Sequence, residues 1–95
     1  MALFITLANF TDQGIKNVKD SPDRLQAFKS SAEKLGLKVK DAYYCVGAHD
    51  IVLISEGTVE ALTAALLKTA TLGNVRTQTL RAFTPDEFKK ILGTI

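Results

Sequence analysis

The sequence predicts an α+β fold: a four-stranded antiparallel sheet, two long helices and a short C-terminal helix. Four runs rich in β-branched and aromatic residues alternate with segments that carry helix-start signals, in the order β-α-β-β-α-β. Only a turn separates the second and third strands, so they form a hairpin. With right-handed crossovers, this order gives the ferredoxin-like plan, in which the first and third strands are central and both long helices lie on one face.

The first strand spans Ala2–Phe10 and is apolar on both of its faces. A polar connection over Thr11–Asp20 follows, with Gly14 as a breaker. Ile15 and Val18 lie three residues apart within it, which allows a single helical turn.

The first long helix begins with Ser21 as N-cap and Pro22 at the first helical position. Apolar residues at helical spacing give it one buried face: Leu25, Phe28, Ala32 and Leu35. Gly36 ends the helix in the left-handed conformation.

The hairpin joins a strand over Leu37–Val46 to a strand over Asp50–Glu56, through the turn Gly47–His49. The second long helix then starts with Thr58 as N-cap and ends at Gly73-Asn74. Its buried stripe is expected to consist of Leu62, Ala65, Leu66, Thr69 and Leu72.

The last strand spans Val75–Phe83, and the short helix Pro85–Leu92 closes the chain. Thr84 caps that helix, and Glu87 completes a capping box. The whole chain, 1–95, is expected to form a single domain, because 95 residues leave no room for two cores.

Two helices cover only one face of the sheet, yet the first and third strands are apolar on both faces. A large bare apolar face is a liability in a soluble monomer. The open face is therefore expected to pack against a second copy about a two-fold axis. The alternative is that the C-terminal helix folds back and covers it.

Composition excludes several classes of function. Twelve basic residues are interleaved with ten acidic ones, for a net charge of +2, so no basic patch for nucleic acid is expected. The most apolar helical stretch is too short to span a bilayer. One cysteine, Cys45, forms no internal disulfide and is expected to be a buried, inert thiol. A cytoplasmic protein is expected, with no membrane partner.

The hairpin turn holds the most suggestive residues. His49 is the only histidine, the residue type whose unperturbed pKa lies nearest to neutrality, so it is a weak candidate for a general base or for a metal or haem ligand. Asp50 is a weak candidate for the group that orients it. Both also have plain structural interpretations: a solvated histidine, and a carboxylate that accepts backbone N–H groups in a turn.

Asn9, Tyr44, His49 and Arg76 are candidate ligand-binding residues, as scattered polar groups on an apolar sheet. Tyr43 and Tyr44 point to opposite faces, so only one of them lies under the helices. No spacing matches a zinc site, a phosphate-binding glycine loop or a Ser/His/Asp arrangement, and no cofactor is expected.

The chain resembles the GYD-domain proteins nearly from end to end. The matching segments are Phe4–Leu7, Phe10–Gly14, Lys19–Pro22, Gly47–Asp50, Leu72–Thr77, Thr79–Thr84 and Glu87-Phe88. The resemblance implies a small bacterial protein of the dimeric α/β-barrel type and supplies no established catalytic residues. The chain departs from the family in the Gly-x-Tyr-Asp turn that gives the family its name. His49 stands where tyrosine is usual, whereas Gly47 and Asp50 are retained.

Two functions remain open from the sequence. One is a homodimer or higher oligomer that binds a small organic metabolite in a pocket between the sheets. The other is a cofactor-independent enzyme, of the monooxygenase or isomerase kind that related barrels host, with His49 as base or ligand and Asp50 as its orienter. A purely structural subunit is a third possibility.

Overall fold

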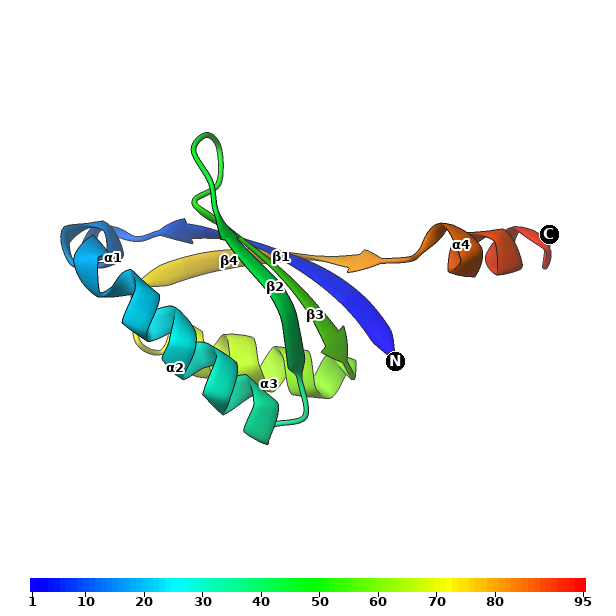
Figure 1. The fold of residues 1–95 in the computed structure, drawn as a ribbon, viewed down its shortest axis with the longest axis horizontal. Helices are drawn as coiled ribbons and strands as arrows, with labels where there is room; N and C mark the ends of the chain where they lie inside the picture. The colour runs from blue at the N-terminus through cyan, green and yellow to red at the C-terminus, as the bar shows by residue number, and fades with distance from the viewer.

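The computed structural model describes residues 1–95 and confirms the ferredoxin-like order of elements (Figure 1). The elements are β1 (Ala2–Phe10), α1 (Asp12–Lys16), η1 (Val18–Asp20), α2 (Ser21–Lys34), β2 (Lys38–Tyr44), β3 (Ile51–Gly57), α3 (Val59–Ala70), β4 (Val75–Ala82) and α4 (Pro85–Leu92). The sheet order is β2-β3-β1-β4, so β1 and β3 are central as expected. None of the helices is long and apolar enough to cross a membrane.

The register assigns the side chains of β1 to two faces. Phe4, Thr6 and Ala8 are buried, whereas the odd-numbered residues between them are only partly buried. Because residues paired across an antiparallel ladder share a face, the same division extends to β3 and β4. One face is thus buried under α2 and α3, and the other is open.

Small residues bring the two long helices together at one end of the covered face. Ala32 of α2 packs with Ala61 and Ala65 of α3, and Phe4 and Leu37 complete this cluster. Alanine lets helix backbones approach closely, so this end is closed. A second, smaller cluster of Ala8, Ile51 and Leu53 lies on the same face of the sheet.

The start of α2 differs from the prediction. Ser21 does not cap the helix but belongs to its first turn, and the preceding Asp20 makes no capping side-chain bond. The reason is that η1 leads directly into α2, so the chain is already helical at Asp20. The Ser21 hydroxyl is buried and hydrogen-bonded to the Tyr44 hydroxyl at 2.9 Å. The predicted end is confirmed: Gly36 has φ +93°.

Gly14 is not a breaker but a buried residue inside α1. A Cβ at this position would lie 1.9 Å from the carbonyl oxygen of Asn74, so only glycine allows the approach. The Thr11 backbone N–H donates to that same oxygen at 3.1 Å, and the Thr11 hydroxyl donates to the Gly73 carbonyl at 2.6 Å. We call these contacts the clasp; they hold the β1–α1 turn against the α3–β4 turn.

The C-terminal helix does not fold back over the sheet. Figure 1 shows α2 and α3 on one side of the sheet, the β2–β3 loop rising on the other side, and α4 projecting beyond the end of β4. The capping box of Thr84 and Glu87 is present as predicted, so α4 is well formed without a neighbour. The sequence alternative in which α4 covers the open face is therefore wrong.

Three smaller expectations also fail near element ends. Leu35 is exposed, because α2 already ends at Lys34. Cys45 is exposed, not buried, because β2 already ends at Tyr44 and Cys45 begins the loop. Leu72 is exposed and lies beyond the end of α3, so the buried stripe of that helix is shorter than expected.

Candidate functional site

A hollow of about 300 Å³ lies on the open face of the sheet, where the β2–β3 loop meets the end of β1 and the start of β4. It is lined by Leu7, Asn9, His49, Arg76, Thr77 and Gln78. Three of the four residues that the sequence suggested for ligand binding therefore come together in one place. The register explains this, because Asn9 pairs directly with Arg76 across β1 and β4.

The contacts of Asn9 fix the orientation of the His49 ring. The Asn9 Nδ2 group donates to the Ala48 carbonyl at 2.7 Å, and the Asn9 Oδ1 atom lies 2.9 Å from His49 Nδ1. Because Oδ1 only accepts, Nδ1 carries the hydrogen. In the neutral ring, the lone pair is therefore on Nε2, which has no hydrogen-bond partner in the chain.

Asp50 turns away from the imidazole. Its Oδ2 atom accepts the Phe10 backbone N–H at 2.9 Å, and its own N–H donates to the Ala8 carbonyl at 2.9 Å. Its carbonyl accepts the Cys45 N–H at 2.7 Å. Asp50 thus anchors the loop to the end of β1, and Asn9 is the residue that orients His49.

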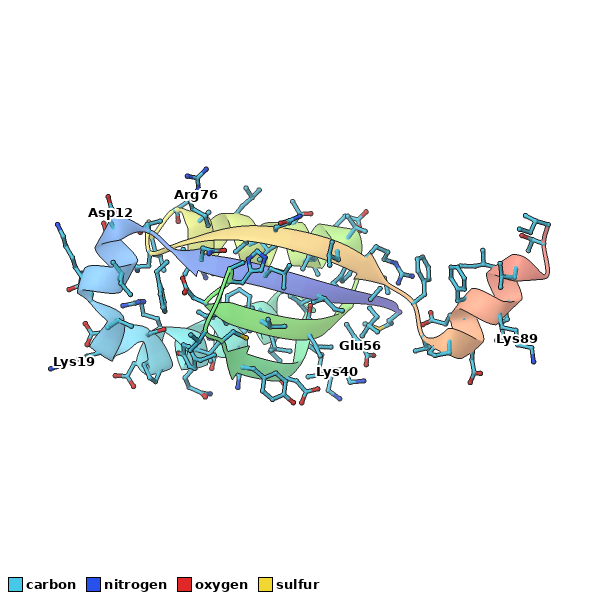
Figure 2. The ribbon with its side chains drawn as sticks, turned by 90° about the horizontal axis from the view of Figure 1, so that it is seen from above. Asp12, Lys19, Lys40, Glu56, Arg76 and Lys89 are labelled. Carbon is cyan, nitrogen blue, oxygen red and sulfur yellow. The ribbon has the colours of Figure 1, made fainter.

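Arg76 is the only charged side chain that lines the hollow. It is exposed and makes no ion pair, so its guanidinium donors are free. Figure 2 looks onto the open face and shows Arg76 at the same end of the molecule as Asp12. Gln78, two residues further along β4, adds an amide on the same face. Gln78 was not among the residues predicted from the sequence, although its spacing of two from Arg76 on a strand places both on one face.

Tyr44 does not reach the hollow. It pairs with Ile51, whose side chain is buried on the covered face, and its hydroxyl bonds to Ser21. Its neighbour Tyr43 pairs with Val52 and is exposed on the open face. The prediction that the two tyrosines point to opposite faces is confirmed, and Tyr43 is the one that faces outward.

The only ion pair of the chain lies at another edge of the sheet. The Lys40 Nζ atom is 2.7 Å from Oε1 of Glu56 (Figure 2). Their hydrogen bond raises the pKa of Lys40 and lowers the pKa of Glu56. Both side chains are well exposed, so this pair contributes little to stability. The charge of Arg76 is therefore not neutralised by any neighbour within the chain.

The hollow combines one aliphatic side chain, Leu7, with hydrogen-bonding groups and one cation. This combination suits a small molecule that carries a carboxylate or other acceptor groups. In the neutral ring, the Nε2 atom of His49 has a lone pair that is available to a hydrogen-bond donor or a metal. His49 is, however, the only residue of the usual metal-binding types in the lining.

Comparison with solved structures supports the fold. The crystal structure of MtbAldR superimposes with a TM-score of 0.64 at 14% identity, over 87% of this chain and 53% of that chain. The crystal structure of TTHA0845 from Thermus thermophilus gives a TM-score of 0.56 at 25% identity, over 88% of this chain and 95% of that chain. The first likeness shows the fold alone, and this chain spans about half the length of MtbAldR.

No curated protein matches the chain. The model of the GYD domain matches residues 4–92, which is almost the entire sequence. This match confirms the resemblance that the sequence motifs indicated: the chain belongs to the GYD-domain family.

Proposed function

We propose that the chain forms a homodimer through the open face of its sheet, and that the dimer binds a small organic metabolite in the hollow around Asn9, His49 and Arg76. The observation that carries the proposal is the amount of surface that one chain leaves exposed. The partner sheet would close the hollow, and the loop of the hairpin would form its wall.

A single chain exposes more surface than a compact monomer of its mass. Its accessible surface is 6442 Å², whereas a compact monomer of its 10.3 kDa mass exposes about 5,350 Å². The excess, about 1,100 Å², exceeds the roughly 800 Å² that each partner buries in a typical stable interface. Its radius of gyration, 14.4 Å, also exceeds the roughly 12 Å expected of a compact domain of this length.

Two parts of the molecule expose apolar side chains that a second copy could cover. On the open face, Ile5 lies between Ile54 of β3 and Leu80 of β4, and together they form an aliphatic row across the sheet. On α4 and just beyond its end, apolar residues recur at helical spacing and are exposed: Phe88, Ile91, Leu92 and Ile95. An exposed apolar stripe on a helix that projects from the sheet calls for a partner. A second copy supplies surfaces of this same kind.

The ligand would be bound by complementary charge and hydrogen bonds. Arg76 offers a planar set of donors that matches a carboxylate, and Gln78 adds an amide beside it. His49 is held in a fixed orientation by Asn9, so its Nε2 atom is ready to accept a hydrogen bond from a ligand hydroxyl. Closure by a partner sheet would exclude water and strengthen these contacts.

The binding proposal is tested with a panel of small carboxylic acids and their neutral amides. We expect at least one acid to raise the midpoint of thermal unfolding more than its amide does. Arg76→Gln should remove that difference. A panel without any selective stabilisation would contradict the binding role.

The need for a dimer is tested by two neighbouring tyrosines. Tyr43→Lys puts a charge on the open face and should abolish both the dimer and the binding of the selected acid. Tyr44→Lys makes the same change on the covered side and should keep both, at some cost in stability from the lost bond to Ser21. Binding that survives in a monomeric Tyr43→Lys variant would show that the hollow needs no partner.

A second candidate function is enzymatic, and the free Nε2 atom of His49 favours it. In that role, His49 would remove a proton from the bound molecule, with Asn9 in place of Asp50 as its orienting partner. Turnover of a panel compound that disappears in His49→Ala would support the enzyme. A Soret band on titration with haem that disappears in the same variant would instead make His49 a haem ligand.

A further inference from the structure

A second cavity lies on the covered face, on the opposite side of the sheet from the hollow. Its volume is about 380 Å³, and it lies between the first half of α2, the second half of α3 and the strands beneath them. It shares only Thr77 with the hollow. The two are therefore separate sites, and the proposed role of His49 and Arg76 leaves this cavity without a function.

The walls of the cavity are mainly apolar. They include Ala8, Leu25, Phe28, Ile51, Leu53 and Leu66. At the other end of the helices, Ala32, Ala61 and Ala65 pack together and leave no comparable space. The cavity is thus a local opening of the helix layer, of a size that is usual for ligand sites.

Two cations and no carboxylate line this cavity. Arg24 and Lys68 both contribute to the lining, whereas no aspartate or glutamate does. The Arg24 guanidinium is positioned by the Asn17 carbonyl at 2.8 Å and the Gly14 carbonyl at 3.4 Å. These contacts use only part of its five N–H donors, so others are available to an anion. Lys68 makes no ion pair within the chain.

We propose that this cavity binds a monocarboxylate with an apolar body of about ten to fifteen carbon atoms. The size follows from the volume, since a cavity of about 150 Å³ holds one benzene ring. The apolar body would lie between the helices and the sheet, against Phe28 and Leu53. The carboxylate would meet Arg24 and Lys68, the only charged groups of the lining.

The test uses decanoate as the probe and 1-decanol as its uncharged counterpart. Decanoate binds one molecule per chain in isothermal titration and raises the unfolding midpoint. Decanol, which lacks the charge, binds about tenfold more weakly, because a charge-assisted hydrogen bond is lost. Absence of decanoate binding to the wild-type protein, or equal binding of both compounds, would overturn the proposal.

Substitutions test binding of the carboxylate separately from binding of the apolar body of the ligand. Lys68→Gln weakens decanoate binding about tenfold and leaves decanol binding unchanged. Arg24→Gln acts in the same direction, although it also removes contacts that hold α1. Lys34→Gln removes a cation of α2 that does not line the cavity, and it has no effect. Equal losses in Lys68→Gln and Lys34→Gln would mean that only the net charge of the protein matters, which contradicts the proposal.

Filling the cavity distinguishes this site from the hollow. Ala8→Leu places a larger side chain at the floor of the cavity and abolishes binding of decanoate, while the thermal midpoint is kept or raised. His49→Ala and Arg76→Gln, in the hollow, leave decanoate binding intact. Loss of decanoate binding in His49→Ala would place the ligand on the open face and overturn the proposal, whatever the fate of the proposed function.

Discussion

The two faces of the sheet contain different kinds of side chain, in an unexpected distribution. The covered face of β1 presents Thr6 and Ala8 beside Phe4, and Thr6 is buried with its hydroxyl bonded to Thr79 at 2.9 Å. The open face presents Leu3, Ile5 and Leu7, which are only partly buried. Within β1, the face without helices is thus the more aliphatic of the two. Alternation along a strand therefore does not say which side is the interior, and an apolar open face points to a second layer from elsewhere.

The largest expected effect comes from the covered face. Phe4 is 4% exposed, and Phe4→Ala should lower the free energy of unfolding by about 3 to 5 kcal/mol, at any protein concentration. Ile5→Ala changes the next residue, which faces the other way. Its loss in stability should vary with protein concentration, because the association of two chains is weakened. Chemical denaturation at two concentrations measures both. A concentration-independent loss in Ile5→Ala would show that the open face is covered within one chain.

The clasp should affect stability without affecting association. Gly14→Ala forces a methyl group against the Asn74 carbonyl and should cost about 2 to 3 kcal/mol in unfolding free energy. The clasp belongs to the turns and not to the open face, so the mass of the folded protein should not change. Denaturation together with light scattering separates the two quantities. An altered mass at unchanged stability would contradict this division between the two regions.

A smaller effect is expected from the projecting helix. Ile91→Glu places a charge on the apolar stripe of α4 and should raise the dissociation constant of the dimer about tenfold. Lys90→Glu introduces a glutamate at the preceding position, which is not part of the apolar stripe. It should leave the dissociation constant of the dimer nearly unchanged. Sedimentation velocity over a concentration series compares them. Equal behaviour of the two variants would mean that α4 takes no part in the assembly.

The smallest expected effect is a loss of stability of α4 at acid pH. The Thr84 backbone N–H donates to Glu87 at 2.9 Å, and this hydrogen bond lowers the pKa of Glu87 below its usual value. The stabilisation is therefore complete above the ordinary glutamate pKa and is lost as the pH falls through the lower pKa of the folded state. The protection factors of the α4 amides against hydrogen exchange should fall there, before those of the β1 amides. Glu87→Gln has no charge to lose, so the same pH dependence in that variant would exclude the capping carboxylate as the cause.

The sequence predicted those structural features that depend on residues close to one another along the chain. The bounds of β1 and α4 agree with the sequence prediction, because β-type composition and a capping box act over a few residues. Gly14 was misjudged, because its role depends on Asn74, which lies far away in the sequence. Ser21 was misjudged, because the chain is already helical at Asp20, and its hydroxyl has a distant partner in Tyr44.

The candidate site was predicted only in part, for the same reason. Asn9, His49 and Arg76 were singled out by residue type, but only the register of β1 with β4 and the contact of Asn9 with His49 show that they meet. The face on which Tyr44 lies depends on the pairing of β2 with β3, which includes an irregularity between Val39 and Asp41. The cavity beneath the helices gave no local signal at all, since it follows from how α2 and α3 are placed.

The most direct test of whether a second chain covers the open face is the mass of the native protein in solution. Sedimentation equilibrium of the wild-type chain at micromolar concentration should give at least twice the 10.3 kDa of one chain. The central substitution Ile5→Lys, with an unchanged far-UV spectrum, should bring the mass back to that of one chain. A wild-type protein that sediments as a single folded chain would contradict the pairing of open faces and, with it, the enclosed binding site.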